Sequence, residues 1–214
     1  MADAHTSYLP AAGHHWALPL YDLIVKLLGG NPTRAELVRQ GALRPSHRVL
    51  EIGCGTGSLL LEIKRSHPDV DAVGLDPDPK ALERARRKAN RVGLSIQLDR
   101  GLADALPYPD ASFDRVFSSF MFHHLPAENR EPSLREVRRV LKPGGSLHLL
   151  DFAGAGTNGH GSFTRLLHAS HRLEDNTETR LLALIRQAGF ADARKAAEGG
   201  MLFGHIRVNY YRAT

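Results

Sequence analysis

A short segment of the chain combines an acidic side chain with three glycines at alternate positions. In "VLEIGCGTGSLL" (residues 49–60), Glu51 stands at the end of an apolar run, and Gly53, Gly55 and Gly57 follow it. A turn between a first strand and a helix exposes backbone N–H groups, and glycines let a ligand approach the main chain closely. The segment therefore predicts a ligand site in this turn, with a carboxylate beside it.

The neighbouring residues distinguish three kinds of ligand. A phosphate-binding loop ends in Gly-Lys-Ser/Thr, whereas Gly57 is followed by Ser58 and Leu59, so a phosphate loop is not expected. A dinucleotide fingerprint counted from Gly53 would need glycine at position 58, and it would place a pyrophosphate close to Glu51. The third kind is a cofactor with a cationic end, and an acidic residue ahead of the glycines favours it.

Length and composition indicate one water-soluble domain, residues 1–214. The chain is 42% hydrophobic and 24% charged, as globular proteins are, and it is long enough to bury a sizeable core. Cys54 is the single cysteine, which excludes an internal disulfide and favours a reducing cytoplasm. The longest apolar stretch, 16–28, is interrupted by Pro19 and Asp22 and is too short to span a bilayer.

The formal net charge of +5 raises the alternative of a nucleic-acid partner. Basic residues gather in 83–91 and 135–142, both with helical patterns. We interpret these runs as solvated helix faces, because no aromatic-interleaved basic stretch accompanies them. Nucleic acid is therefore not the expected partner.

Strand and helix patterns alternate from residue 47 onward. Strands are expected at 47–53, 71–76, 94–100, 113–120 and 146–152, and helices at 58–67, 79–93 and 133–145. This alternation predicts an α/β fold with a mostly parallel sheet that is covered on both faces. After residue 177 a helix precedes two strand patterns that no helix separates, so these two strands should pair antiparallel.

The N-terminal region, 1–46, holds two expected helices, at about 16–28 and 33–41, that have no place in the sheet. We interpret this region as a helical lid over one end of a core formed by 47–214. The segment 153–176 is a second candidate for a covering element.

Four motifs of the chain resemble those of class I S-adenosylmethionine-dependent methyltransferases. "VLEIGCGTG" is similar to the family's first motif, in which an E/D-x-G-x-G-x-G turn follows the first strand. "VGLDPDP" (73–79), "LPYPDASFDRVFSSFMFHHL" (106–125) and "LREVRRVLKPGGSLHLLDF" (134–152) resemble the next motifs of the small-molecule branch, which includes ubiquinone and menaquinone biosynthesis enzymes. The resemblance covers about 45–152. It implies a Rossmann-like, seven-stranded, mostly parallel sheet with an antiparallel C-terminal hairpin.

The resemblance also implies roles for individual residues in binding S-adenosylmethionine. The three glycines should lie against its methionine and ribose portions, and Glu51 should face the ammonium of its amino-acid end. Asp76 should hold both ribose hydroxyls, because one carboxylate can accept two hydrogen bonds from a diol. Pro77 or Asp78 should flank the adenine, and Ser118, near the end of the fourth strand, should also contact the cofactor.

One position departs from the family pattern. Many relatives carry an aspartate four residues before the leucine that corresponds to Leu106, and it binds the adenine amino group. Here that position is Leu102, and the nearest acid is Asp104. Either Asp104 reaches the adenine, or the main chain near Ala103 does so while Leu102 packs on the ring. We favour the second alternative.

Two histidines, His123 and His124, follow the expected fourth strand, where an acceptor would meet the methyl group. Methyl transfer requires alignment, and it requires a base only when the acceptor must lose a proton. Either histidine could be that base or could cap the next segment, and His124 is favoured over His123. "SSFM" (118–121) replaces the Asn/Asp-Pro-Pro-aromatic motif of exocyclic-amine methyltransferases, so DNA adenine is not an expected acceptor.

The sequence thus predicts methyl transfer to a small molecule, with S-adenosylhomocysteine as the second product. Transfer to oxygen, nitrogen and carbon all remain open. An RNA-modifying enzyme and a non-catalytic S-adenosylmethionine-binding protein are the alternatives. No metal is expected, because His160, His168 and His171 have no cysteine or matched carboxylate nearby.

Overall fold

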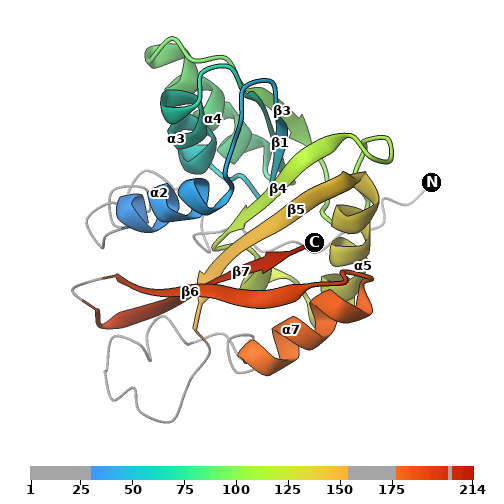
Figure 1. The fold of residues 1–214 in the computed structure, drawn as a ribbon. Helices are drawn as coiled ribbons and strands as arrows, with labels where there is room; N and C mark the ends of the chain where they lie inside the picture. Colours follow the sequence, from blue (N-terminus) through green and yellow to red (C-terminus); the bar gives the residue numbers. More distant parts are fainter. Residues whose placement is uncertain (1–29, 154–176, 202–203) are drawn as a thin grey trace.

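The protein is built around a seven-stranded sheet in the order β3-β2-β1-β4-β5-β7-β6, seen in a computed structural model (Figure 1). The structure describes residues 30–153, 177–201 and 204–214. The strands are β1 Arg48–Ile52, β2 Asp71–Asp76, β3 Gln97–Arg100, β4 Phe113–Ser119, β5 Leu141–Phe152, β6 Ala193–Met201 and β7 Ile206–Ala213. Strands β1 to β5 pair in parallel, and β7 runs antiparallel to both β5 and β6. The predicted Rossmann-like sheet with an antiparallel hairpin is confirmed.

Five α-helices and one short 3-10 helix connect these strands within the described residues. They are α2 Gly30–Gln40, α3 Ser58–Ser66, α4 Pro79–Arg91, η2 Phe122–His124, α5 Ala127–Val140 and α7 Glu178–Gln187. Helix α4 begins where the sequence suggests, because the Asp78 side chain accepts a hydrogen bond from the Lys80 N–H and Pro79 occupies the first turn.

The helix expected at 133–145 has different bounds. Helix α5 starts at Ala127, well before residue 133, and it contains Pro132 in its second turn. A proline there removes only the hydrogen bond to the carbonyl four residues earlier, and the helix continues through it. Strand β5 starts at Leu141 rather than at residue 146.

The sheet is buried on both faces. Consecutive strand residues contribute to opposite layers, as strand geometry requires, and Val116 and Phe117 of β4 are an example. Helices α5 and α7 pack on one face through Leu134 and Ile185, whereas α2 and α3 pack on the other. Two covered faces explain why the central strands are continuous apolar runs rather than alternating ones.

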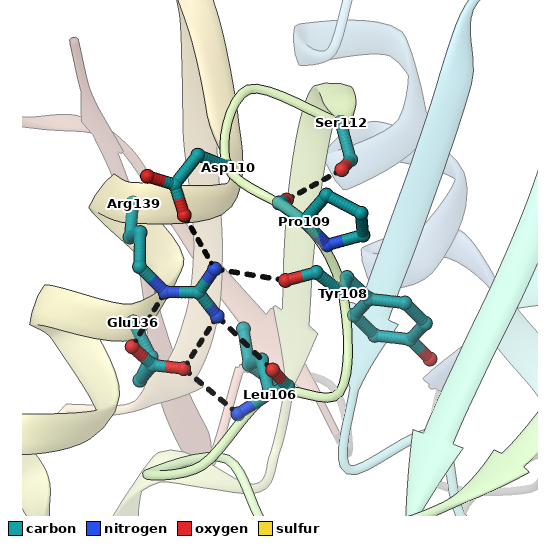
Figure 2. A network of polar contacts seen from close by, with 7 residues as sticks. All are labelled: Leu106, Tyr108, Pro109, Asp110, Ser112, Glu136 and Arg139. Atoms are coloured by element: carbon teal, nitrogen blue, oxygen red, sulfur yellow. Dashed lines mark hydrogen bonds and ion pairs between the residues drawn. The ribbon is translucent and has the colours of Figure 1, made fainter.

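Arg139 of α5 makes several of the hydrogen bonds that hold the loop between β3 and β4 (Figure 2). The Arg139 guanidinium donates to the carbonyls of Leu106 and Tyr108 at 3.0 and 2.8 Å, and to the Asp110 carboxylate at 2.7 Å. Glu136 accepts from both Arg139 and the Leu106 N–H, and the bond to Arg139 holds the pKa of Glu136 below its ordinary value. Arg139, which belongs to the basic run 135–142, therefore has a structural role.

Helix α2 confirms the second helix expected in the N-terminal region, and it is fixed to the sheet. Leu37 and Val38 are buried, the Tyr210 hydroxyl donates to the Thr33 carbonyl at 3.1 Å, and the Arg115 guanidinium donates to the Gly41 carbonyl at 2.8 Å. The helix expected at 16–28 lies outside the described residues, and so does the segment 153–176 apart from its first residue, so the lid stays a prediction. In the described ranges, no helix is long and apolar enough to cross a membrane.

Replacing Tyr210 with phenylalanine should loosen α2 selectively. The change removes one hydrogen bond, so we expect a loss of about 0.5–1.5 kcal/mol in the free energy of unfolding. Hydrogen exchange should also become faster in α2. The matched control is Tyr108→Phe, which removes the 2.9 Å bond to Asp99 on another part of the sheet. Unchanged α2 exchange in Tyr210→Phe, or equal loosening in Tyr108→Phe, would contradict this account of how α2 is held.

Candidate functional site

The carboxyl ends of the parallel strands meet at one edge of the sheet, and the order of strands reverses there. Strand β1 lies between β2 and β4, so the turn after β1 is at the switch point, where ligands of open α/β sheets bind. The residues 53–57 after β1, 77–78 after β2, 101–104 after β3 and η2 after β4 all border this edge. The predicted cofactor residues lie along it.

The three glycines of the turn have different surroundings. All have positive φ: 65° at Gly53, 51° at Gly55 and 74° at Gly57. Such a conformation costs other residues roughly 1–2 kcal/mol. A Cβ on Gly53 would overlap the Met121 side chain, and one on Gly57 would lie 3.0 Å from the Ala85 Cβ. Among the described residues, no atom lies within 4 Å of a Cβ built on Gly55. Gly55 therefore borders open space, whereas its two neighbours are required for packing inside the protein.

Glu51 is a buried carboxylate that lacks part of its hydrogen bonding. The residue is 3% exposed, and its Oε2 has no hydrogen-bond partner in the part of the chain that the structure describes. Burial raises the pKa of the carboxyl to about 8, with a smaller contribution from Asp76. The charge of Arg34 on α2 and the Leu60 N–H in the first turn of α3 lower the pKa of Glu51 in turn, by less than burial raises it. Buried polar atoms are normally paired, so Oε2 fits a site that receives a donor from a ligand.

Asp76 connects the end of β2 to the glycine turn. The residue is 9% exposed, its Oδ2 accepts from the Gly55 N–H at 2.8 Å, and its Oδ1 accepts from the Asp78 N–H at 2.9 Å. Burial raises the pKa of Asp76, and these two hydrogen bonds oppose the rise. Since each carboxylate oxygen can accept two hydrogen bonds, one position on each remains for a ligand diol. Pro77 is half-buried next to it.

The loop after β3 runs beside Asp76. The Gly101 N–H donates to the Asp76 carbonyl at 3.3 Å, and Leu102 and Ala103 are half-buried. The Asp104 carboxylate accepts from the Asn129 amide of α5. Because this contact turns Asp104 toward α5, it favours the hypothesis that the main chain near Ala103 contacts the adenine.

A histidine and an aspartate form a buried pair at the ends of β4 and β5. The Asp151 Oδ2 accepts from the backbone N–H of His123 at 2.9 Å, and its Oδ1 lies 2.6 Å from the His123 Nδ1. Burial would raise the pKa of Asp151, but the charge and hydrogen bonds of His123 bring it below its ordinary value. His124 is half-exposed, and its ring centroid is 4.0 Å from that of His123. The aspartate therefore fixes His123, although the sequence favoured His124.

Ser118 also lies at this edge. It is fully buried on β4, in register with Ile52 of β1 and Leu149 of β5, and its hydroxyl has no hydrogen-bond partner among the described residues. Its contact with a cofactor stays a prediction. The described ranges hold no group of three or more metal-ligating side chains.

Sequence reasoning missed three residues of this region. Arg34 and Asp151 were not anticipated, although an acid that ends the apolar run "LHLLDF" is a signal that could have identified Asp151. Lys88 was assigned to a solvated helix face, which is wrong: its ammonium donates to the hydroxyls of Thr56 at 3.1 Å and Ser58 at 2.9 Å, beside the glycine turn. Spacing along α4 could not reveal this contact, because it depends on how α3 and α4 pack.

Comparison with known proteins identifies the class of this fold and site. Residues 49–145 match the family model of a methyltransferase domain. A demethylmenaquinone methyltransferase of Deinococcus radiodurans is 39% identical over 151 residues, which are 69% of this chain and 62% of that protein. A 27-O-demethylrifamycin SV methyltransferase of Amycolatopsis mediterranei is 40% identical over 112 residues, 51% of this chain and 40% of that protein. The chain thus spans less than two thirds of these relatives.

Solved structures show the same fold. A SAM-dependent methyltransferase from Aquifex aeolicus superposes with a TM-score of 0.70 at 19% identity, over 94% of this chain and 99% of that one. The chain therefore contains a class I S-adenosylmethionine-dependent methyltransferase domain. Within that class, the domain is related to the ubiquinone and menaquinone C-methyltransferases, and the resemblance predicted from the four motifs is confirmed.

The residues present fit S-adenosylmethionine, the cofactor of this class. Its ammonium needs an anionic acceptor, which Glu51 Oε2 would supply, and its ribose diol needs a carboxylate with free acceptor positions, which Asp76 would supply. No described residue covers the Gly55 position between these two groups.

Glu51→Gln should make the ligand-free protein more stable at alkaline pH. The folded state keeps the Glu51 proton up to pH 8, whereas an unfolded chain loses it near the ordinary value of 4.5. Between these values the folded state binds more protons, so wild-type stability falls as pH rises. Glutamine does not titrate, so the variant lacks this contribution to the pH dependence of stability. Relative to wild type, the variant should gain on the order of 2–4 kcal/mol between pH 5 and pH 8, measured by urea unfolding.

Glu62→Gln, which changes a half-buried glutamate on the same helix–turn unit, is the matched control and should follow the wild-type pH dependence. If wild type and Glu51→Gln lose stability in parallel between pH 5 and pH 8, Glu51 is not a destabilising buried acid.

Asp76→Ala should weaken binding of S-adenosylhomocysteine by about 10- to 100-fold, because hydrogen bonds to a charged group contribute about 1.5–3 kcal/mol. Isothermal calorimetry measures this directly. Asp69→Ala removes an exposed acid from the loop between α3 and β2, at the other end of β2 from Asp76, and should bind as wild type does. Equal affinity of wild type and Asp76→Ala would remove Asp76 from the cofactor site.

Proposed function

We propose that the protein transfers a methyl group from S-adenosylmethionine to a small-molecule acceptor. The observation that carries this proposal is the pair of buried carboxylates, Glu51 and Asp76, on either side of the uncovered Gly55 main chain. When bound, the cofactor supplies a methyl group on a positively charged sulfur. The protein holds its amino-acid end with Glu51 and its ribose with Asp76, while Leu102 and Ala103 border the adenine.

The acceptor side of the site follows from the ends of β4 and β5. If the turn after β1 holds the methionine portion, the residues after β4 would border the reacting end of the cofactor, because η2 follows β4 beside that turn. Met121 packs against Gly53, so η2 and its histidines border the same space. Protein groups there can align an acceptor and exclude water, which are the main requirements of a displacement at carbon.

A small acceptor is supported by the names of the relatives, which denote a demethylmenaquinone and a demethylrifamycin methyltransferase. The basic residues support it as well, because three of those that could contact a nucleic acid are engaged with other groups of the protein. Arg87 pairs with Glu83, Arg135 pairs with Glu131, and Arg139 is committed to the loop network. A cytoplasmic location remains our proposal from the single, buried Cys54.

A labelled-methyl assay tests the function. The protein is incubated with methyl-labelled S-adenosylmethionine and a metabolite extract, and labelled products are identified by mass. We expect a labelled small molecule that disappears in Asp76→Ala but not in Asp69→Ala. Total RNA offered in parallel should remain unlabelled, and its binding should vanish near physiological salt.

Two results would contradict the proposal. Label in RNA with none in the metabolites would establish the RNA-modifying alternative. Tight binding of S-adenosylmethionine with no labelled product in either pool would favour a non-catalytic binding protein.

A further inference from the structure

We propose that Lys88 is a positioning residue for cofactor binding: from the last turn of α4, it holds the glycine turn and the start of α3 in the arrangement that receives the amino-acid end of S-adenosylmethionine. This inference rests on the proposed function and adds to it a residue that acts through the turn. The contacts of the Lys88 ammonium carry it.

The Lys88 ammonium joins two hydroxyls that lie on either side of Gly57. It donates to the Thr56 Oγ1 at 3.1 Å and to the Ser58 Oγ at 2.9 Å. Thr56 is 7% exposed in the turn, and Ser58 is the first residue of α3. Hydrogen bonds from a charged donor are stronger than those between neutral groups. One cation of α4 therefore fixes the junction between the glycine turn and α3.

The start of α3 lacks the side-chain cap that usually fixes a helix N-terminus. Its N-cap residue is Gly57, at φ 74°, which has no side chain to accept from the first free N–H groups of the helix. A Cβ on Gly57 would lie 3.0 Å from the Ala85 Cβ, so α4 packs directly on this residue. Lys88 lies three residues after Ala85, on the same face of α4. Helix α4 thus restrains the turn by packing at Ala85 and by hydrogen bonds from Lys88.

The charge of Lys88 is not explained by the stability of α3. A helix N-terminus carries a partial positive charge, so a cation beside it is unfavourable. The first turn of α3 has no acidic residue to offset this effect. The charge of Lys88 does act on Glu51, because it opposes the rise in the pKa of that carboxyl that burial causes, as the charge of Arg34 does. The position of this half-buried lysine therefore fits the acidic ligand site better than it fits the helix.

The groups that Lys88 restrains are those next to the expected amino-acid end of the cofactor. Ser58 lies in the same turn of α3 as Leu60, whose N–H forms a hydrogen bond with Glu51. A displaced helix start would weaken this bond, which favours the ionised form of Glu51. The ammonium of the cofactor, which the proposed function assigns to this carboxylate, would then be held less well.

The expected nucleoside end is held by contacts that do not include Lys88. Asp76, at the end of β2, accepts from the Gly55 and Asp78 N–H groups at 2.8 and 2.9 Å. The loop 101–104 after β3 borders the same side. Loss of Lys88 should therefore affect binding of the amino-acid end much more than binding of the nucleoside end.

The competing explanation is that Lys88 only ties α4 to α3 and supports the fold as a whole. Two ligands separate the explanations. S-adenosylhomocysteine and 5′-methylthioadenosine share adenine, ribose and sulfur, and only the first carries an amino-acid end. A positioning role predicts a loss of affinity for the first ligand, whereas a general structural role predicts similar losses for both.

Isothermal calorimetry with both ligands makes this comparison. In Lys88→Met we expect the affinity for S-adenosylhomocysteine to fall by about 10-fold and that for 5′-methylthioadenosine by less than about 2-fold, because hydrogen bonds of a charged group are lost at one end of the site. The matched control is Arg91→Met, which removes an exposed cation from the same last turn of α4 and should bind both ligands as wild type does. Ser58→Ala removes one of the two acceptors and should show the same difference between the ligands, so the comparison does not depend on the folding of Lys88→Met alone.

A double-mutant cycle tests the route through the hydroxyls. Thr56→Val combined with Ser58→Ala should weaken S-adenosylhomocysteine binding about as much as Lys88→Met does. Adding Lys88→Met to that pair should have little further effect, since residues that act through one contact are not additive. A full additional loss would show that Lys88 acts by another route and would overturn the proposal.

The outcomes separate this inference from the proposed function. Failure of the wild type to bind either ligand would refute the proposed function itself. Binding of both ligands by the wild type, with equal losses in Lys88→Met or with no loss at all, would refute only the role given to Lys88.

Discussion

The burial of Glu51 is the constraint on which the site depends. A carboxylate removed from water is costly unless it is paired. Here one oxygen has no partner among the described residues, and burial raises the pKa to about 8. Two neighbouring helices limit this cost without removing it: the Leu60 N–H of α3 and the charge of Arg34 on α2 favour the ionised form. The protein thus keeps an incompletely satisfied acid where a cationic ligand end would complete it, a local loss of stability that serves binding.

The fold supplies the other groups at the correct places because parallel strands end at one edge. Asp76 at the end of β2, the glycine turn after β1, η2 after β4 and Asp151 of β5 all reach that edge from different parts of the sequence. Hydrogen bonds then couple them in pairs: Asp76 to the Gly55 main chain, and Asp151 to His123. We propose that the first of these pairs borders the cofactor.

Most of the fold could be predicted from the sequence, and so could the position of Glu51, Asp76 and the glycine turn at one edge of the sheet. Apolar strand periodicity, the caps of α4 and the glycine spacing are local signals, and Glu51 and Asp76 lie within motifs whose order is specific. The acceptor half could not be predicted in the same way. Neighbouring His123 and His124 look equivalent in sequence, and only the pairing of β4 with β5 brings Asp151 to one of them. Lys88 and Arg34 were missed for the same reason, since helix packing decides which way a long cationic side chain extends.

The measurement that tests the central claim most directly is the number of protons released when S-adenosylhomocysteine binds. Calorimetry at pH 7 in two buffers of different ionisation enthalpy gives this number. Since Glu51 with its pKa of about 8 is mostly protonated at that pH, pairing with the ligand's ammonium should release close to one proton per site. Glu51→Gln should bind more weakly and release none through this group. Tight binding with no proton release by the wild type, or with the same release in both proteins, would contradict the role given to Glu51.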